Sequence, residues 1–342
     1  MRGRNARQRR EDFRPVYSPA GFDNELRGTI EELRAGRWMA MRALLADTGA
    51  DWGRRTARTQ VLGVVAAGSH LVEAWLREDP YSADAAVMAA RVAVERAVRA
   101  HRERYRQAGE VEKEARQACY AAVERVPADP VPWICLLTLA QLDDRQERPE
   151  HRERAREPML PPGPWGLLYR VGERDRYNRE AHHRMLQFLH ARAAGGLGSQ
   201  APAIDFVRWV SSWAPVGSPL LALPLYAYVE QYRRQIDTAH GGAGSGLRQQ
   251  WAHEPIILDT RSALRGWFEH TDPAGESVSD LNHLAHALWA GHERPAAARV
   301  FDALGPYFTP YPWLHVTEYP DGPEPARTEF LRARSQSLGA RG

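Results

Sequence analysis

The sequence between residues 281 and 310 reads LNHLAHALWAGHERPAAARVFDALGPYFTP, and its apolar residues predict two successive helices. The first segment has apolar residues at i, i+3, i+4 and i+7, and the second resumes helical spacing after a break at Gly291. The apolar positions are Leu281, Leu284, Ala285 and Leu288, followed by Ala297, Phe301 and Leu304. A helical hairpin of this size cannot bury its apolar face alone, so the pattern indicates that further hairpins pack against it.

The rest of the chain also has helical periodicity. Apolar stripes within 26–45 predict a second hairpin near the N-terminus. Asp51 is placed to cap the next helix, and Ser82 or Asp84 is placed to start a long one. Only 255–258 resembles a strand, and it is too short to carry a sheet. The expected fold class is therefore all-α.

Two junctions between predicted helices have the same form. The sequences at 76–80 and 126–130 both end in Asp-Pro, which favours an extended residue followed by the first turn of a new helix. With the hairpin at 281–310, these junctions resemble those of tetratricopeptide repeats, which implies an α-solenoid of antiparallel helical hairpins. A regular array repeats about every 34 residues, whereas Pro80 and Pro130 are 50 residues apart. We therefore expect an irregular tetratricopeptide-like α-solenoid of roughly twelve to sixteen helices.

The chain is also similar in general character to uncharacterised helical repeat proteins of high-GC actinobacteria. The similarity rests on an arginine-rich linker and on the sequence NREAHHRML at 178–186. Lys113 is the only lysine among 46 basic residues. Such a composition suits recognition of phosphate or carboxylate groups, but a GC-rich genome accounts for it as well, and we favour that explanation. The net charge of +3 is too small to indicate a dedicated nucleic-acid-binding protein.

Proline, glycine and charged runs divide the chain into five regions. In order, we expect a disordered arginine-rich arm, an N-terminal helical repeat region, a charged proline-rich linker, a C-terminal helical repeat region and a tail. These regions are 1–20, 21–142, 143–164, 165–318 and 319–342. Within the tail, 328–337 has the pattern of a short terminal helix.

Membrane insertion is not expected, because the longest apolar run, 220–229, contains a proline and is half the length of a membrane helix, which needs about twenty residues. The sequence has two cysteines without CxxC spacing, which suits a reducing compartment. We therefore expect a cytoplasmic protein.

Histidines are the first candidates for chemistry, because six of them lie in two predicted helical regions. They are His182, His183, His190, His283, His286 and His292. A zinc hydrolase would need two ligands on one helix face, a third ligand and a carboxylate that acts on the metal-bound water. Neither region contains HExxH, and His182 shares a helix face with Leu186 and Leu189, which predicts a buried core histidine. We expect no metal or other cofactor, and a metal-dependent hydrolase is an alternative function.

Tryptophans are abundant and lie in two kinds of position. Trp38, Trp75 and Trp289 lie within apolar stripes, which predicts packing between hairpins. Three others directly follow a proline: Trp133, Trp165 and Trp313. These either pack as wedges at helix starts or line the edge of a peptide-binding groove, and we favour packing.

The sequence contains no phosphate-binding glycine motif and no catalytic serine motif, so we expect a non-catalytic scaffold that binds a protein or peptide. In a helical superhelix the first helix of each hairpin would line the inner surface, where exposed polar side chains meet the partner. The candidate partner-binding residues are Arg179, His183, Asn282 and His286. The partner is an unidentified protein or peptide; neither nucleic acid nor membrane is expected, although the arginine-rich N-terminal arm leaves nucleic-acid association as a second alternative.

Overall fold

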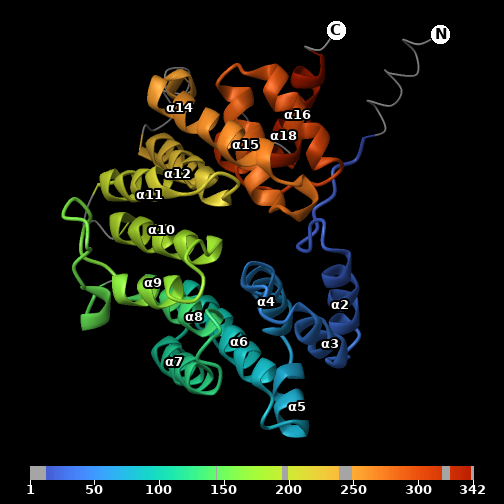
Figure 1. Ribbon diagram of the computed structural model, residues 1–342, viewed down its shortest axis with the longest axis vertical. Helices are drawn as coiled ribbons and strands as arrows, with labels where there is room; N and C mark the ends of the chain where they lie inside the picture. Colours follow the sequence, from blue (N-terminus) through green and yellow to red (C-terminus); the bar gives the residue numbers. More distant parts are fainter. Residues whose placement is uncertain (1–12, 144, 195–198, 239–248, 318–323, 340–342) are drawn as a thin grey trace. The chain divides into compact units, whose positions relative to one another are not determined.

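The computed structural model describes residues 13–143, 145–194, 199–238, 249–317 and 324–339. Within these ranges the chain forms sixteen α-helices joined by turns and short 3-10 segments (Figure 1). In the same ranges, β-type pairing is confined to two isolated bridges, Val16 with Tyr307 and Glu153 with Gly163. The all-α class predicted from the sequence is therefore confirmed. No helix in this part of the chain combines the length and hydropathy needed to span a bilayer.

The chain divides into two compact units, which we call unit 1 and unit 2. Unit 2 is the segment Asp23–Phe206, whereas unit 1 combines Met1–Phe22 with Val207–Gly342. The division falls within helix α11 (Ala201–Trp213).

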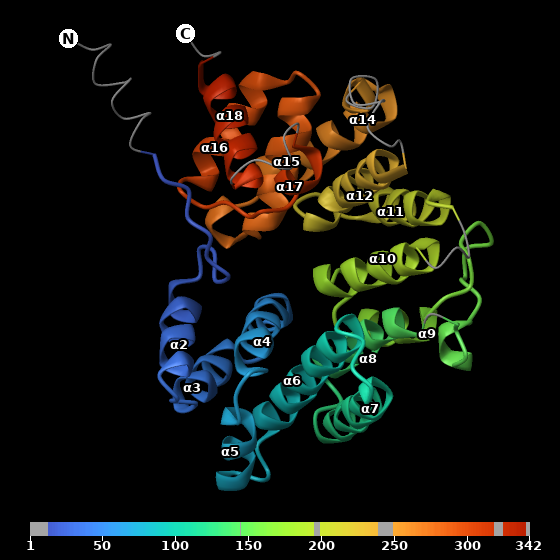
Figure 2. The same ribbon diagram turned by 180° about the vertical axis from the view of Figure 1, so that it is seen from behind.

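Unit 2 is built of helices that pack on their neighbours in the chain. They are α2 (Asn24–Arg34), α3 (Met39–Thr48), α4 (Trp52–Ala66), α5 (Leu71–Glu78), α6 (Ala83–Arg102), α7 (Ala108–Arg125), α8 (Val131–Leu139), α9 (Trp165–Gly172) and α10 (Arg179–Ala194). The hairpin predicted within 26–45 is formed by α2 and α3. Helix α6 packs along both α7 and α8 and also contacts α4, so it is central to unit 2 (Figure 2).

Side-chain caps fix the helix starts in unit 2 at positions that the sequence predicts. The backbone N of Arg54 donates to Asp51 Oδ1 at 3.2 Å, which caps α4. The backbone N of Ala85 donates to Ser82 Oγ at 3.2 Å, so Ser82 rather than Asp84 caps α6. Each cap satisfies an N–H group of the first turn that has no partner within the helix.

The segment 143–164, predicted as a linker, is folded against unit 2. His151 is fully buried, and its Nδ1 lies 2.7 Å from Asp143 Oδ2. Arg116 of α7 donates through Nη1 to Glu150 Oε1 at 2.9 Å. The contact with Arg116 holds the segment on α7. Helices α8 and α10, which lie on either side of the segment in the chain, pack against each other. The segment therefore does not separate two repeat regions.

Unit 1 contains the hairpin that the sequence predicts at 281–310. Its helices are the C-terminal part of α11, α12 (Leu223–Thr238), α14 (Glu254–Ser262), α15 (Val278–Ala290), α16 (Arg294–Leu304), α17 (Trp313–Val316) and α18 (Pro325–Gly339). Helices α15 and α16 form the hairpin, and Gly291 directly follows α15. Helix α15 also contacts α12, α14 and α18, which makes it the central helix of unit 1.

Two short predictions in unit 1 have different outcomes. The strand-like segment 255–258 is helical and belongs to α14. The predicted terminal helix at 328–337 is confirmed as part of α18, which begins earlier and ends later.

The N-terminal arm, predicted to be disordered over 1–20, is partly ordered on unit 1. The backbone N of Val16 donates to Pro306 O at 2.7 Å, and Phe308 N donates to Val16 O at 3.0 Å. These two bonds pair the arm with the turn after α16, so its described residues are not a free tail. Residues 1–12 lie outside the described part of the chain.

Most of the tryptophans pack as predicted. Trp38 and Trp75 stack with ring centroids 5.5 Å apart, and Trp165 and Trp313 are fully buried. Trp133 is half-buried, with the guanidinium of Arg174 lying 5.4 Å from its ring centroid. The proline-preceded tryptophans of α9 and α17 are therefore core residues.

Candidate functional site

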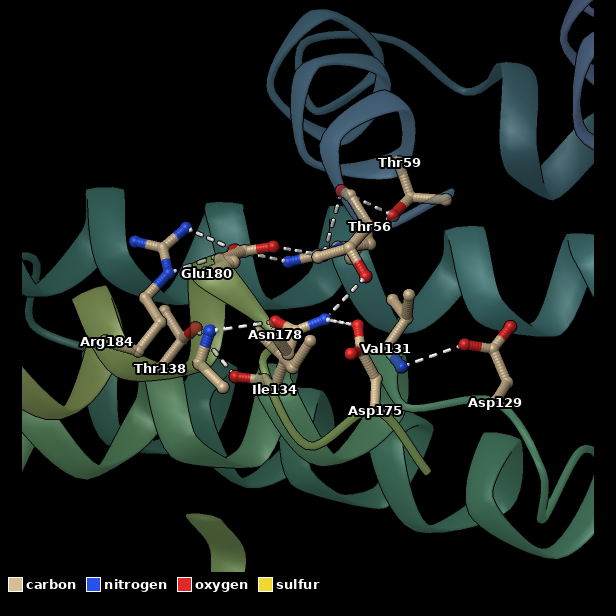
Figure 3. Close-up of polar contacts among 12 residues, drawn as sticks. Thr56, Thr59, Asp129, Val131, Ile134, Thr138, Asp175, Asn178, Glu180 and Arg184 are labelled. Carbon is tan, nitrogen blue, oxygen red and sulfur yellow. Dashed lines mark hydrogen bonds and ion pairs between the residues drawn. The ribbon is translucent and has the colours of Figure 1, made fainter. Parts of the chain in front are cut away.

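Helix α10, which carries two of the predicted partner-binding residues, is seated by a buried ion pair. Arg91 of α6 donates through Nη1 and Nη2 to the two carboxylate oxygens of Glu180, at 2.8 and 2.6 Å. Arg184 donates to the same carboxylate at 3.0 and 2.9 Å (Figure 3). Burial alone would lower the pKa of Arg91 and raise the pKa of Glu180. The attraction between the opposite charges is stronger, so the pKa of Arg91 is raised and the pKa of Glu180 is lowered. Both groups are therefore ionised, and their pairing fixes α10 against α6.

Asn178, directly before α10, joins the same helix to α4. Its Nδ2 donates to Thr56 Oγ1 at 3.2 Å and to Asp175 Oδ2 at 2.8 Å, and its Oδ1 accepts from Ala181 N at 3.0 Å (Figure 3). His182 is buried, with Nδ1 2.8 Å from Asn178 O. Burial lowers the pKa of His182 to about 4, although this hydrogen bond acts in the opposite direction. The predicted core histidine is therefore confirmed.

Two of the predicted partner-binding residues, Arg179 and His183, lie on α10. They are four residues apart and so share one face of the helix, and both side chains are half-buried. The contacts of Glu180 and Asn178 hold this face in a fixed position. The role of Arg179 and His183 in binding stays a prediction.

The other two predicted residues, Asn282 and His286, are buried within unit 1, at 0% and 1% exposure. Asn282 Oδ1 accepts a hydrogen bond from Trp313 Nε1 at 2.8 Å. The ring of His286 lies edge-on to Trp251 and Trp313, with centroids 4.7 and 5.4 Å away, and burial lowers its pKa to about 3. The expectation that these side chains are exposed is wrong, because α15 is covered by helices on several sides.

The remaining histidine of α15 is also engaged in packing. His283 Nδ1 lies 2.8 Å from Ser279 O, and its ring stacks on Tyr226 with centroids 3.5 Å apart. Across the residues that the structure describes, no group of three or more His, Cys, Asp or Glu side chains could hold a metal ion.

A pocket on unit 1 brings together residues from α11 and α14. It opens to solvent and has a cavity volume of about 350 Å³. Its lining residues are Arg208 from α11 and Glu254, Pro255, Leu258 and Asp259 from α14. The α14 residues are spaced at i, i+1, i+4 and i+5, so they form one face of that helix. The pocket therefore has one wall that combines apolar and acidic side chains, and an arginine on the other wall.

A buried tyrosine holds the carboxylate of this pocket. Tyr228 of α12 is buried, and its hydroxyl donates to Asp259. Arg208 Nη2 lies 3.5 Å from the same hydroxyl oxygen. Burial raises the pKa of Asp259 above its ordinary value, although Tyr228 and Arg208 act to lower it; burial and the neighbouring carboxylate raise the pKa of Tyr228. A carboxyl group with a perturbed pKa in a concave site is typical of binding and catalytic sites.

The sequence patterns did not identify this pocket, because its lining residues come from two helices and lie between positions 208 and 259. A signal was nevertheless present in α14. A proline directly after an acidic residue is common in the first turn of a helix, and Glu254-Pro255 occupies that position. If 255–258 is read as a strand, Leu258 and Pro255 lie on opposite faces. The helical face on which they lie beside the two acidic residues is then not recognised.

Comparisons with known proteins identify no relative. No protein-family model, no curated protein and no solved structure matches this chain. The pocket and the helical architecture are therefore the features of the chain that bear on its function.

Proposed function

We propose that this protein is a non-catalytic scaffold that binds a peptide segment of another protein. The helical hairpins supply a rigid framework on which a binding face can be held. Within unit 2, α2 contacts α3 and α4, α4 contacts α6, and contacts continue through α7, α8, α9 and α10. This serial packing supports an irregular tetratricopeptide-like arrangement of that unit, as the resemblance in sequence implies.

The observation that carries the proposal is the α14 wall of the pocket. Leu258 is 56% exposed beside Pro255, and both flank a depression that contains the Tyr228-held Asp259. An apolar side chain at the rim of a pocket with a few polar groups provides both contact area and orientation for a bound segment. Helix-built faces of this kind bind peptides through a small number of apolar anchors.

A peptide-display experiment with the full chain tests the proposal. We expect a library of short random peptides to yield binders, and Leu258→Asn to weaken their binding by about tenfold or more, because a neutral polar side chain replaces the apolar anchor. Val64→Asn on α4 is the matched control, since Val64 has a similar exposure of 52% and lies in unit 2. Circular dichroism verifies that both variants keep their helix content. Failure to select any peptide, or equal binding by the Leu258→Asn variant, would contradict the proposal.

A separate pair of substitutions tests the face of α10. If Arg179 and His183 form a binding face of their own on unit 2, Arg179→Glu with His183→Glu weakens binding of selected peptides that Leu258→Asn leaves unaffected, while the helix signal is unchanged. If no selected peptide binds more weakly to this variant, α10 is removed from the candidate binding surfaces.

A further inference from the structure

The unit 1 pocket is lined by more negative than positive side chains. Glu254 and Asp259 place two carboxylates on the α14 wall, whereas Arg208 is the single cation among the five lining residues. Their formal charges sum to −1 when both carboxylates are ionised, so an anionic ligand on this wall would be repelled. A cation is the complementary ligand for the α14 wall.

Asp259 retains capacity for a second partner. Its Oδ2 accepts from the buried hydroxyl of Tyr228, but a carboxylate has two oxygens and about four positions that accept hydrogen bonds. Partial burial disfavours its charged form, and an adjacent cation with N–H donors would offset that desolvation. A charge-assisted hydrogen bond at this position is roughly twice as strong as a neutral one.

The apolar part of the same wall defines the shape of a suitable ligand. Pro255 and Leu258 line the pocket between Glu254 and Asp259, so two apolar residues are flanked by two acidic ones along one face of α14. Lysine and arginine match this pattern, because their methylene stems cover apolar surface while their charged ends reach polar groups. A small inorganic cation would leave Leu258 uncovered.

We propose that the pocket receives the basic side chain of a lysine or arginine in the bound peptide. The methylene stem packs on Leu258 and Pro255, and the charged end donates to Asp259 and Glu254. Tyr228 acts as a positioning residue, because its buried hydroxyl donates to the Asp259 carboxylate and orients it. This assignment rests on the proposed peptide-binding function and specifies the ligand of its site.

The experiment uses four pools of short peptides with acetylated and amidated ends. All pools have randomised apolar flanking positions, and the central residue is arginine, citrulline, lysine or Nε-acetyl-lysine. Citrulline and acetyl-lysine keep the methylene stem of the side chain but remove its charge. Retention on immobilised full chain is measured for each pool. We expect the arginine or lysine pool to be retained about tenfold or more above its neutral counterpart.

Variants connect this preference to the pocket. Asp259→Asn with Glu254→Gln is expected to abolish the preference for charged pools while circular dichroism shows unchanged helix content. The matched control is Asp47→Asn with Glu124→Gln, which makes the same chemical changes at exposed positions on α3 and α7 and should keep the preference.

The possible outcomes separate this inference from the proposed function. Equal retention of charged and neutral pools, combined with a loss of retention in Leu258→Asn, would overturn the basic-side-chain assignment and leave peptide binding intact. A charge preference that survives in the Asp259→Asn, Glu254→Gln variant would also overturn it. Retention of no pool would count against both the assignment and the scaffold function.

Discussion

Unit 2 and unit 1 hold their helices together with different side chains. Unit 2 buries four arginines, Arg55, Arg58, Arg91 and Arg116, whereas the buried residues described for unit 1 include no arginine. The core of unit 1 instead gathers aromatic rings around Trp313, which lies 5.4 Å from Phe330 and 6.1 Å from Phe301 between ring centroids. Unit 2 also buries aromatic residues, so the difference is the added set of internal ion pairs.

The ion pairs of unit 2 connect helices that are distant in the sequence. Arg55 of α4 donates to Asp129 and to Asp84 at 2.6 Å each, and Arg91 reaches Glu180 across 89 positions. Such contacts require a defined partner and direction, whereas aromatic packing tolerates several arrangements. Our hypothesis is that the buried pairs specify which helices of unit 2 associate, rather than adding net stability.

The largest expected effect follows from breaking the Arg91 pair. Glu180→Leu leaves a buried guanidinium without its carboxylate partner, which should reduce the free energy of unfolding by about 3–5 kcal/mol. Urea denaturation of the full chain measures the loss, and hydrogen exchange should locate it at α6 and α10.

A double variant serves as the control for that measurement. Arg91→Met with Glu180→Leu removes both charges, so the free energy of unfolding should recover most of the loss. If the double variant is as unstable as the single one, the effect comes from lost packing and not from an unpaired charge. Buried ion pairs would then not explain the difference between the interiors of unit 2 and unit 1.

An intermediate effect, a loss of about 2 kcal/mol in the free energy of unfolding at pH 5, is expected from the burial of His286 in unit 1. The pKa of His286 is about 3 in the folded chain and about 6.5 in an unfolded one, so the unfolded state binds the additional proton between these values. The contribution of His286 to the free energy of unfolding is fully present above pH 6.5. It decreases as the pH falls towards 3, by up to about 1.4 kcal/mol per pH unit. The His286→Phe variant should lack this contribution.

His182 of unit 2 provides the comparison for the pH measurement. Burial lowers the pKa of His182 to about 4, so its contribution to the free energy of unfolding also decreases as the pH falls below 6.5. We expect the difference in the free energy of unfolding between wild-type chain and His286→Phe to change with pH in this range, and the difference for His182→Phe to change in the same direction. A difference for His286→Phe that does not vary with pH would contradict the assigned burial of His286.

The smallest effect is expected from a surface ion pair of unit 1. Arg299 Nη1 lies 2.7 Å from Glu269 Oε1, with half of the arginine side chain exposed. Glu269→Gln should reduce the free energy of unfolding by less than about 1 kcal/mol, and 1 M salt should remove the difference. A loss comparable with that of Glu180→Leu would show that unit 1 also depends on ion pairs.

The local parts of the fold could be predicted from the sequence. Helical spacing at 281–310 located α15 and α16, and Asp51 and Ser82 are the caps that their residue types indicate. These features depend on residues within a few positions of one another, so a single sequence contains the required information.

The division into units and the candidate site could not be predicted in this way. The contact of 143–164 with α7 pairs Glu150 with Arg116, which is 34 positions away, so no local pattern indicates it. For Asn282 and His286 the sequence predicts an exposed face, because a helix is expected to have one polar side. Helix α15 is instead covered by α12, α14, α16 and α18, so its polar residues find partners inside the core.

The pairing of Arg91 with Glu180 also bears on how the chain is made. The carboxylate is added to the growing polypeptide 89 residues after the guanidinium. At a translation rate of about 5–20 residues per second, Arg91 spends roughly 4–18 s without the carboxylate that later pairs with it. Helix α6 therefore leaves the ribosome before its permanent neighbour exists, and unit 2 cannot complete its interior until α10 has been synthesised.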